Sequence, residues 1–217
     1  MSTGWYGKSI KINFFTTHQM ITFKNLSKQD PYILFKKKYD EAILSKQKFI
    51  EAACVSSFSK EKDEVDSRYV NLKFIDNKEF IFFSNYQSPK SSQFSLHDQI
   101  SVVILWSEIN FQIRLKAKIK KTSLDYSRNY FKTRSKGKNA LAISSNQSRK
   151  INSYDSVKDN YNEALSSKNL TICPDYWGGF AFTPYYFEFW EGQDLRLNKR
   201  DVYEQNGNNW NHFMLQP

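Results

Sequence analysis

Two arginines end the most aromatic stretch of the chain, which runs from Pro174 to Arg200 with the sequence PDYWGGFAFTPYYFEFWEGQDLRLNKR. Arg196 lies four residues before Arg200, and guanidinium groups suit phosphate or carboxylate oxygens. The indole of Trp190 suits a flat ring. The pair Gly178-Gly179 lets the backbone turn or approach a neighbour closely. By itself, the stretch also fits a barrel strand followed by a solvated basic turn.

A second candidate for anion binding is the segment SNYQSPK at residues 84–90. Ser88 can cap a helix whose first residue is Pro89. The free backbone N–H groups at such a helix start, together with Lys90, make a natural phosphate cradle. A capped helix with one lysine is weak evidence when it stands alone.

Further polar candidates lie on a predicted strand and a predicted helix. Residues 109–122 alternate between apolar and polar side chains, so Gln112 falls on the polar face of a half-buried strand. Tyr130 and Arg134 are four residues apart and share one face of a helix that Ser123 can cap. Each of these residues also has an ordinary interpretation as exposed polar surface.

The elements that position these residues follow from the pattern of apolar side chains. Residues 1–28 show no clear period and are predicted to be an N-terminal arm or lid, and residues 29–217 form one domain. Asp30 is expected to cap a helix with Pro31 at its first position. The other predicted elements are a strand at 50–58, a hairpin at 67–84 that turns at 76–79, strands at 100–106 and 109–122, helices from 123 to about 134 and at 153–168, an aromatic strand after Gly179, and a final hairpin of 201–205 and 210–215. This pattern predicts a mainly β domain of the α+β class.

Composition limits the class of protein. The chain has 217 residues, 40% hydrophobic and 25% charged, as expected for one globular domain. Cys54 and Cys173 cannot make a disulfide framework, which favours a reducing cytoplasm. Neither a signal peptide nor a membrane span is indicated, and three widely spaced histidines give no metal-binding pattern, so no metal is expected. The net charge of +10 comes from scattered lysines, which favours a solvated surface over a nucleic-acid partner.

The order of the motifs resembles that of a known family. WGGF, a proline, EFW-G and RL-x-x-R follow one another from Trp177 to Arg200. This order resembles the C-terminal signature of the pyridoxamine 5′-phosphate oxidase family of FMN enzymes. The earlier segments R-x-V-x-L-K at 68–73, S-N-x-x-S-x-K at 84–90, Y-F-x-x-R at 130–134 and N-Q-S at 146–148 are similar to further motifs of that family. Together they cover roughly residues 30–217 in collinear order, which makes the resemblance specific.

The resemblance implies a fold, a reaction and a partner. The implied fold is the FMN-binding split barrel, a Greek-key antiparallel barrel with peripheral helices. The implied assembly is a homodimer with FMN in clefts between the subunits. The implied reaction is the oxidation of pyridoxamine or pyridoxine 5′-phosphate by oxygen to pyridoxal 5′-phosphate and hydrogen peroxide, in which the cofactor does most of the chemistry.

By family position, the resemblance also implies site residues. Those expected to bind or surround FMN are Arg68, Lys73, Phe83, Ser84, Lys90, Gln112, Gln147, Ser148, Trp190 and Arg200. Those expected to hold the substrate are Lys73, Tyr130, Arg134, Lys138, Arg196 and Asn198. Arg196 and Asn198 of this second set would face the substrate ring as the catalytic pair.

Several positions depart from the family pattern, and most of them lie on the substrate side. Lys138 replaces a serine, Asn198 a histidine, and Pro89 and Met214 customary arginines. Glu191 and Lys199 also depart, from a glutamine and an aspartate. Two alternatives therefore stay open: a split-barrel flavoprotein with a different substrate, including a reductase-type relative, and a non-catalytic protein that binds flavin, another cofactor or nucleic acid.

Overall fold

Residues 20–217 are the part of the chain that the computed structural model describes. Its strands are β1 (Thr22–Lys24), β2 (Ala52–Ser59), β3 (Glu64–Asn71), β4 (Phe74–Asp76), β5 (Glu79–Asn85), β6 (Gln99–Trp106), β7 (Phe111–Lys121), β8 (Trp177–Glu191), β9 (Lys199–Asn206) and β10 (Asn209–Met214). Its helices are α1 (Asp30–Leu44), α2 (Pro89–Leu96), α3 (Leu124–Thr133), α4 (Lys136–Ser144) and α5 (Tyr154–Ser167). Short 3-10 turns, η1 (Ser107–Ile109) and η2 (Asp194–Arg196), follow β6 and β8.

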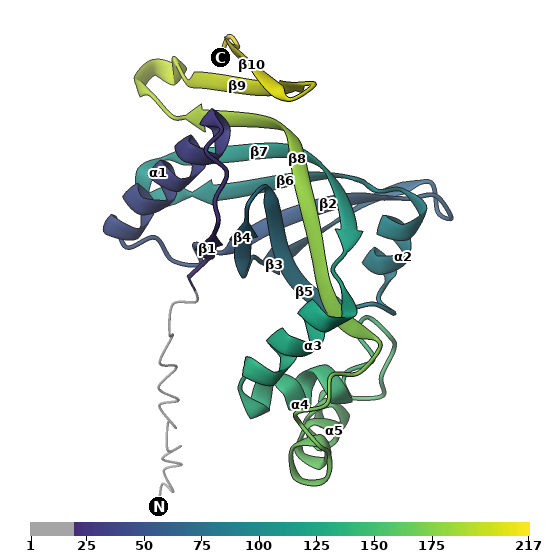
Figure 1. Cartoon of the computed structure of the whole chain (residues 1–217). Coiled ribbons are helices and arrows are strands. Elements are labelled where there is room, and N and C mark those ends of the chain that lie inside the picture. The colour runs from purple at the N-terminus through teal and green to yellow at the C-terminus, as the bar shows by residue number, and fades with distance from the viewer. Residues whose placement is uncertain (1–19) are drawn as a thin grey trace, which may run out of the picture.

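The strands form one mixed sheet in which β8 is the central element. The strand order is β1-β4-β5-β8-β7-β6-β2-β3, and the hairpin β9-β10 joins through β9 to β8. β8 pairs with β7 along its length, with β5 near its start and with β9 near its end. Every described pair is antiparallel except β1 with β4. The sheet is strongly curved (Figure 1), and the predicted mainly β fold with peripheral helices is confirmed.

An aromatic core lies between α1 and the inner face of the sheet. Tyr32, Phe35 and Tyr39 of α1 lie along one helix face and are all buried. The Phe35 ring packs edge-on against Phe80 at 5.1 Å between centroids, and Phe80 stacks on Phe182 at 5.3 Å. Aromatic pairs of this kind add about 0.5–1.5 kcal/mol beyond the burial of their area. This core fixes the strands on which the candidate residues stand.

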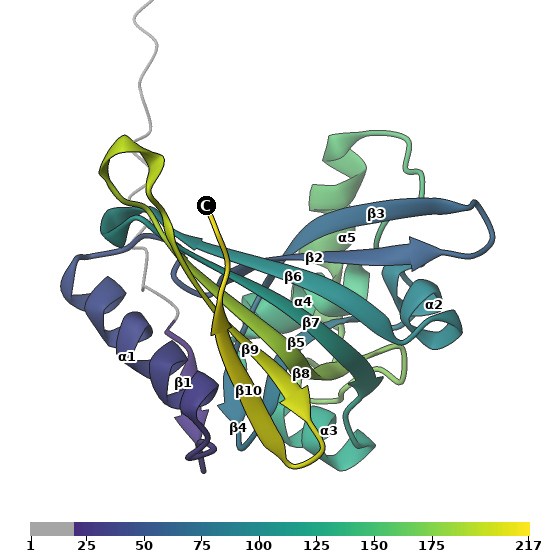
Figure 2. The same ribbon diagram turned by 90° about the horizontal axis from the view of Figure 1, so that it is seen from above.

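The helices occupy different sides of the sheet. α1 lies beside β1, and α2 lies on the opposite side, near β2 and β3 (Figure 2). Helices α3, α4 and α5 gather around the end at which β8 begins, whereas β9 and β10 lie toward the other end of β8 (Figure 1). The site residues that were predicted near the two ends of β8 are therefore separated along the sheet.

The predicted hairpin at 67–84 is wrong in its first half. Its turn at 76–79 is found between the paired strands β4 and β5, and its return strand is β5, but β3 ends at Asn71 and pairs with β2 instead. The chain changes partner at Leu72 and Lys73, whose backbone N–H groups donate to the carbonyls of Glu51 and Ile81. The alternation of apolar residues continues through this break because it records which face is buried and carries no information on which strand lies alongside.

Two predicted helix caps also differ in detail. Gln29 occupies the cap position before α1, and Asp30 is already in the first turn, where its charge still favours the helix dipole. Ser88 lies at the cap position of α2 as predicted, but its hydroxyl donates to the carbonyl of Asn85. The Ser123 hydroxyl does cap α3 by accepting a hydrogen bond from the Tyr126 backbone N–H. Helix α4 and strand β1 were not predicted.

The predicted arm or lid lies largely outside the described residues, since residues 1–19 are not described. Within its remaining part, β1 pairs with β4, and the Ser27 backbone N–H donates to the carbonyl of Asn77. The boundary at residue 28 stays a prediction. Among residues 20–217, no helix has both the length and the apolar character needed to cross a membrane.

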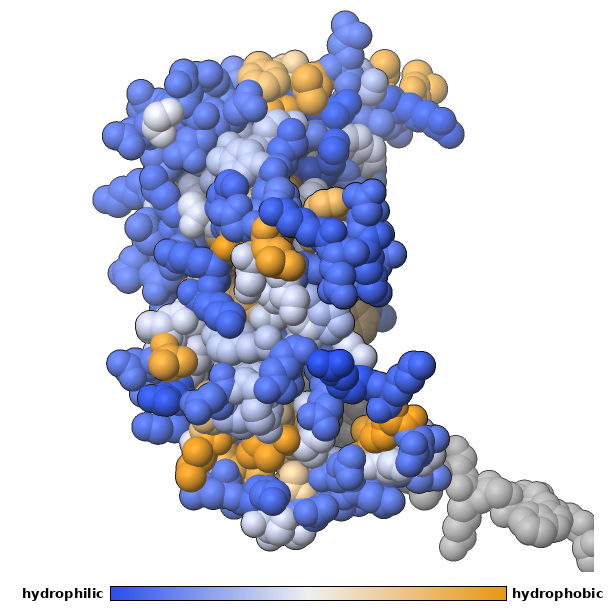
Figure 3. Space-filling model, turned by 90° about the vertical axis from the view of Figure 1, so that its right-hand side faces the viewer, coloured by the Kyte–Doolittle hydropathy of each residue, from blue (hydrophilic) through white to orange (hydrophobic). Residues whose placement is uncertain are grey.

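Space-filling Figure 3 shows the face seen from the right-hand side of Figure 1, where hydrophilic residues cover most of the surface. Hydrophobic residues on this face gather in separate patches rather than in one continuous belt.

Candidate functional site

A cavity of about 340 Å³ lies at the end of the sheet where β8 begins. Side chains from β3, β5, α2, α3 and α4 line it, together with the first residue of β8. The structure brings eight of the predicted site residues together around this cavity: Lys73, Phe83, Ser84, Lys90, Tyr130, Arg134, Lys138 and Gln147. Seven others do not line it: Arg68, Gln112, Ser148, Trp190, Arg196, Asn198 and Arg200.

Lys90 supplies a buried positive charge at one side of the cavity. Only 7% of the residue is exposed, and its Nζ donates to the hydroxyls of Ser84 and Ser88, each at 3.0 Å. Burial lowers the pKa of Lys90 to about 8, and the nearby Arg68 guanidinium contributes in the same direction, while Asp66 opposes it. An ammonium group held among hydroxyls, near a second cation, is a favourable place for an anion.

Arg68 stands behind Lys90 and is held firmly by its neighbours. Its Nη1 donates to the Ser57 hydroxyl at 2.6 Å, and its Nη2 donates to Gln93 Oε1 at 2.9 Å. The Asp66 carboxylate pairs with the same Nη2 at 2.6 Å. Arg68 does not line the cavity itself, but its charge acts on Lys90, so the two cations belong to one corner of the site.

A second group of cations lies on the α3 and α4 side of the cavity. Burial lowers the pKa of Lys73; Glu51 opposes this shift, and the neighbouring Lys138 and Arg134 add to it. Arg134 follows the end of α3, and its Nη2 donates to the Lys138 carbonyl at 3.0 Å. Its Nη1 is buried and has no hydrogen-bond partner among the described residues. A buried N–H group without a partner costs about 1–3 kcal/mol, so an acceptor that reached Nη1 would stabilise the site.

Stacked aromatic rings line the same cavity as these cations. The Phe83 ring stacks on Tyr130 at 4.0 Å and on Trp177 at 5.2 Å between centroids. Tyr130 and Trp177 are also nearly parallel, with an interplanar angle of 15°. The cavity therefore combines cations with a flat apolar wall, which suits a ligand that carries both phosphate and aromatic rings.

Gln147 links the loop after α4 to Ser84 and, through it, to Lys90. Its Oε1 accepts hydrogen bonds from the Ser84 hydroxyl at 3.1 Å and from the Asn85 backbone N–H at 3.4 Å. Since Ser84 Oγ also accepts from Lys90, a continuous chain of hydrogen bonds joins three residues that were predicted to bind the cofactor.

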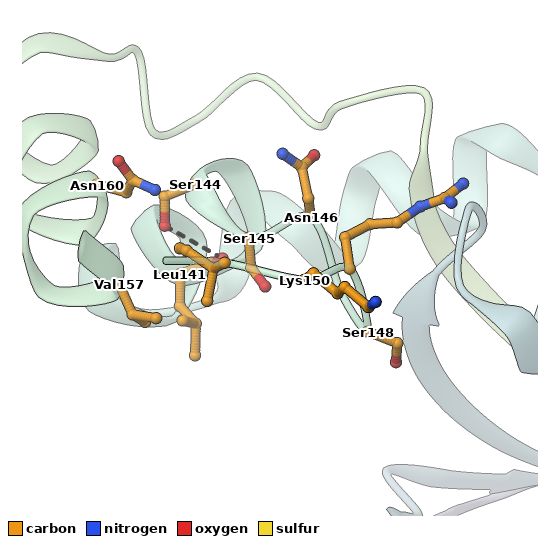
Figure 4. Close-up of a pocket in the computed structure, with 10 residues that line it drawn as sticks. Leu141, Ser144, Ser145, Asn146, Ser148, Lys150, Val157 and Asn160 are labelled. Carbon is orange, nitrogen blue, oxygen red and sulfur yellow. Dashed lines mark hydrogen bonds between the residues drawn. The ribbon is translucent and has the colours of Figure 1, made fainter. Parts of the chain in front are cut away.

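The next residue, Ser148, faces a different space. It lines a cavity of about 330 Å³ between α4, the following loop and α5, together with Leu141, Asn146, Lys150 and Val157 (Figure 4). Ser148 has a positive φ of 67°, so the backbone turns at this residue. Neighbouring residues of the predicted Gln147-Ser148 pair therefore line separate cavities.

The remaining predicted residues lie around the far end of β8. Trp190 is thirteen positions after Trp177 on the strand, a path of at most about 43 Å at 3.3 Å per residue. In register, Gln112 of β7 lies opposite Trp190, which in turn lies opposite Arg200 of β9. These three residues form a second cluster near the end of β8 where β9 pairs with it, whereas the cavity lies where β8 begins. Figure 1 shows β9 and the helices α3 to α5 at these two ends of β8.

Arg200 is fixed in this second cluster by a buried carboxylate. Its Nε and Nη2 both donate to Glu188 Oε1, at 2.9 and 2.7 Å, and its Nη1 donates to the Gln216 carbonyl. Glu188 is 1% exposed and also pairs with Arg114 at 2.8 Å. Removing Arg200 would leave the buried Glu188 carboxylate with fewer partners, so these hydrogen bonds fix the orientation of Arg200.

Arg196 and Asn198 stand on the turn between β8 and β9. Arg196 has a positive φ of 61° and is exposed, and its neighbour Leu195, also at positive φ, is 90% exposed. Asn198 is half-buried, and its Oδ1 accepts a hydrogen bond from the Gln193 backbone N–H at 3.2 Å. The Arg196 side chain is therefore exposed on the surface of this turn.

Sequence reasoning missed several residues that line the cavity. Trp177 belongs to the WGGF motif but was not predicted as a site residue, and neither were Tyr69, Val70 and Asn71 of β3. The position of Trp177 directly before two glycines was an available signal. A Cβ atom at Gly178 would collide with the Tyr86 hydroxyl, and one at Gly179 would lie 2.6 Å from Thr122 Oγ1, so the strand start requires glycine.

Comparison with known protein families gives two matches that together span most of the chain. Residues 37–167 match the family described as pyridoxamine 5′-phosphate oxidase. Residues 177–217 match the family described as the pyridoxine 5′-phosphate oxidase C-terminal dimerisation region.

Similar curated proteins carry the same name. A pyridoxine/pyridoxamine 5′-phosphate oxidase of Legionella pneumophila (strain Paris) is 34% identical over 193 residues, which cover 88% of this chain and 89% of the relative. A protein of the same name from Rhodopirellula baltica is 32% identical over 197 residues, covering 89% of this chain and 88% of the relative.

Solved structures resemble this fold. PhzG from Burkholderia lata 383, in complex with tetrahydrophenazine-1-carboxylic acid, has a TM-score of 0.82 at 23% identity and covers 87% of this chain and 93% of its own. A pyridoxamine 5′-phosphate oxidase-related, FMN binding protein from Nostoc punctiforme has a TM-score of 0.69 at 11% identity, covering 88% and 98%. At these identities the likeness shows the fold, which is the predicted split barrel.

Proposed function

Since the chain belongs to the pyridoxamine 5′-phosphate oxidase family, we propose that it oxidises pyridoxamine or pyridoxine 5′-phosphate with oxygen, using FMN. For pyridoxine 5′-phosphate, the C4′ alcohol loses two electrons and two protons and becomes the aldehyde, while oxygen becomes hydrogen peroxide. For pyridoxamine 5′-phosphate, the same loss gives an imine, and water then releases ammonia. Both routes yield pyridoxal 5′-phosphate.

The observation that carries this proposal is that two groups of cations and a set of stacked aromatic rings meet at one cavity. The reaction needs a cofactor phosphate and a substrate phosphate close to two flat ring systems. Lys90 with Arg68 offers one phosphate position, and Lys73 with Arg134 and Lys138 offers another. The stacked rings of Phe83 and its neighbours lie beside both groups.

The residues present fit FMN. The buried Lys90 ammonium at the start of α2 suits the ribityl phosphate, because helix N-termini and lysines both favour phosphate oxygens. Ser84 and Gln147 offer hydroxyl and amide groups to the polar parts of the same ligand. When bound, FMN supplies the two-electron acceptor that oxygen reoxidises. Lys90, Ser84 and Gln147 would hold the cofactor, and the stacked rings of Phe83, Tyr130 and Trp177 would offer an apolar surface to the flat parts of the ligands.

The second cluster of predicted residues needs another subunit if it is to reach this cavity. Gln112, Trp190 and Arg200 lie near the opposite end of β8, and Arg196 points outward on its turn. We propose a homodimer in which the cluster of one subunit completes the cavity of its partner. Leu195, Leu197 and Met214 are exposed apolar side chains in the region that matches a dimerisation family, and burial in such an interface would stabilise it.

Oxygen uptake with purified, FMN-saturated protein tests the function. Pyridoxamine and pyridoxine 5′-phosphate should each drive oxygen consumption and the formation of one pyridoxal 5′-phosphate per hydrogen peroxide. Unphosphorylated pyridoxine is the control and should react much more slowly. A flavin-loaded protein that consumes no oxygen with either phosphate ester would overturn the proposal.

Subunit mixing tests the shared site. At an FMN concentration too low to load Lys90→Met, this variant lacks a working cavity, and Arg196→Ala lacks a working outward turn. Each protein alone should therefore be nearly inactive under this condition. After the two variants are mixed and their subunits exchanged, half of the molecules at random pairing should be heterodimers that each hold one intact site. Activity should therefore return to about one quarter of the parent's. If no activity returns although subunit exchange has been verified, the shared site is refuted as proposed. Either one subunit supplies both the cavity and the turn, or a different surface of the partner completes the cavity.

The second candidate function is the oxidation of a different substrate. The departures from the family pattern at residues expected to hold the substrate favour it. Lys138 adds a third cation beside Lys73 and Arg134, and Asn198 removes a titratable group from the outward turn. A wider set of phosphate esters in the same oxygen assay separates this candidate from the first. We further propose a cytoplasmic location, since Cys54 and Cys173 are both free thiols.

A further inference from the structure

The indole of Trp177 lies under the guanidinium group of Arg134. The guanidinium carbon is 4.3 Å from the centroid of the Trp177 ring and 5.4 Å from that of Phe131. Cations at such distances from an aromatic face are attracted by the ring, most strongly by tryptophan. Trp177 is 7% exposed, so this contact is shielded from water.

Two contacts fix the orientation of Arg134, and one of its nitrogens has no hydrogen-bond partner among the described residues. Nη2 donates to the Lys138 carbonyl at 3.0 Å, and the indole supports the flat face of the group. Nη1 remains buried and without a hydrogen-bond partner among the described residues. Because Arg134 lines the cavity, a ligand there would meet its guanidinium group.

We propose that Trp177 is the positioning residue that holds Arg134 ready for the phosphate group of the substrate. This inference rests on the proposed function for the identity of the substrate. The contact between Trp177 and Arg134 would position the guanidinium group for any phosphate monoester. Without the indole, the guanidinium group would keep its charge and lose its fixed plane. Binding would then require the side chain to become ordered each time a phosphate arrives.

The surroundings of Trp177 show why its indole is itself fixed. Its ring packs edge-on against Phe131 at 5.0 Å and stacks on Phe83 at 5.2 Å. The following residues, Gly178 and Gly179, allow the strand to pass close to Tyr86 and Thr122, and the Gly179 backbone N–H donates to the Ser127 hydroxyl. The start of β8 is therefore locked against α3, which carries Arg134 at its end.

A double-mutant cycle on FMN-saturated protein tests the proposal. The variants are Trp177→Leu, Trp177→Phe, Arg134→Ala and the Trp177→Leu/Arg134→Ala double mutant. We expect Trp177→Leu to raise KM for pyridoxine 5′-phosphate about tenfold while kcat changes less than about twofold. Trp177→Phe, which keeps a flat ring, should raise it by roughly threefold. In the Arg134→Ala background, Trp177→Leu should have almost no further effect, because residues that act together are not additive.

A second readout is independent of turnover. The affinity for inorganic phosphate, measured by calorimetry on the same proteins, should fall in parallel with the KM changes, and Arg134→Ala defines the part of this binding that belongs to the site. Trp106→Phe is the matched control, since Trp106 is a buried indole outside the cavity that donates to the Ile50 carbonyl. It should leave phosphate affinity unchanged.

The outcomes separate this inference from the proposed function. If the parent protein binds phosphate through Arg134 but oxidises neither phosphate ester, the proposed function fails, and the phosphate cycle still decides the role of Trp177. If Trp177→Leu lowers phosphate affinity equally with and without Arg134, the positioning role is refuted. Equal loss of activity toward phosphorylated and unphosphorylated pyridoxine would refute it as well. Should Trp177→Leu fail to fold, the cycle with Trp177→Phe makes the same comparison.

Discussion

Replacing Lys90 by methionine should stabilise the protein without ligand and weaken its binding of FMN. Methionine has a similar length and no charge, so it fills much of the same space. In the parent protein, the Lys90 ammonium is 7% exposed and is surrounded by the Ser84 and Ser88 hydroxyls. Asp66 compensates this charge only in part, so an anion bound beside Lys90 would stabilise it further.

The pKa of Lys90 gives the size of the effect. Burial lowers this pKa from 10.5 to about 8 in the folded protein. At about 1.36 kcal/mol per pKa unit, the charged form costs the folded state about 3 kcal/mol at neutral pH. The two hydrogen bonds to serine hydroxyls are lost in the variant, and these contribute about 1 kcal/mol each. A net gain of about 1 kcal/mol in the free energy of unfolding is expected for Lys90→Met at pH 7.

The difference between the two proteins should depend on pH in a defined direction. Between about pH 8 and pH 10.5, the unfolded parent binds more protons at Lys90 than the folded parent does, so the parent becomes more stable as pH rises through this window. Below pH 8 both states are charged and the full cost remains. The advantage of Lys90→Met should therefore be largest near pH 7 and should shrink or reverse by about pH 10.

Urea unfolding of flavin-free parent and variant at pH 7 and pH 10 measures these differences. FMN titration on the same proteins measures the second effect, a loss of roughly ten- to a hundredfold in affinity when one charge-assisted hydrogen bond is removed. If Lys90→Met has a lower free energy of unfolding than the parent, by the same amount at pH 7 and at pH 10, the idea that Lys90 carries a costly buried charge is refuted. Unchanged FMN affinity would remove Lys90 from the cofactor site.

Three further predictions follow from the proposed site. Arg134→Ala should raise KM for the phosphorylated substrate roughly ten- to a hundredfold while FMN stays bound, and an unchanged KM would exclude this residue from substrate binding. Arg196→Ala should reduce kcat/KM far more than Asn198→Ala, and Asn198→His should add a pH dependence near 6.5; a fully active Arg196→Ala protein would show that the substrate face is assigned wrongly. Light scattering of FMN-loaded protein should give the mass of two subunits, and a single-subunit mass with FMN bound would contradict the shared site.

The sequence alone predicted most elements of the fold, because their signals are local. The alternation that marks β7 and the serine that caps α3 need only neighbouring residues. The class of the protein also followed from the sequence, through several motifs in one order. Helix α4 was missed because its segment, KGKNALAIS, contains a glycine and shows only a weak helical stripe.

The sequence predicted a set of residues for the candidate site but not where these residues lie in the fold. The spacing of Lys73, Lys90 and Arg134 along the chain says nothing of their shared cavity, which forms when β5, α2 and α3 converge on the start of β8. The break after β3 that brings Lys73 into this cavity is a change of partner strand, which a side-chain pattern cannot record.

Tertiary structure alone also decided which predicted residues lie apart. Residue types and order indicated that Trp190 and Arg200 act with Lys90, yet β8 carries them toward its opposite end. Trp177 shows the reverse case, since only the packing of β8 against α3 places its indole under Arg134. The sequence determined which chemical groups are available, because these are properties of the residues. Their distances and burial were decided by the fold, because contacts between distant segments exist only after the sheet has formed.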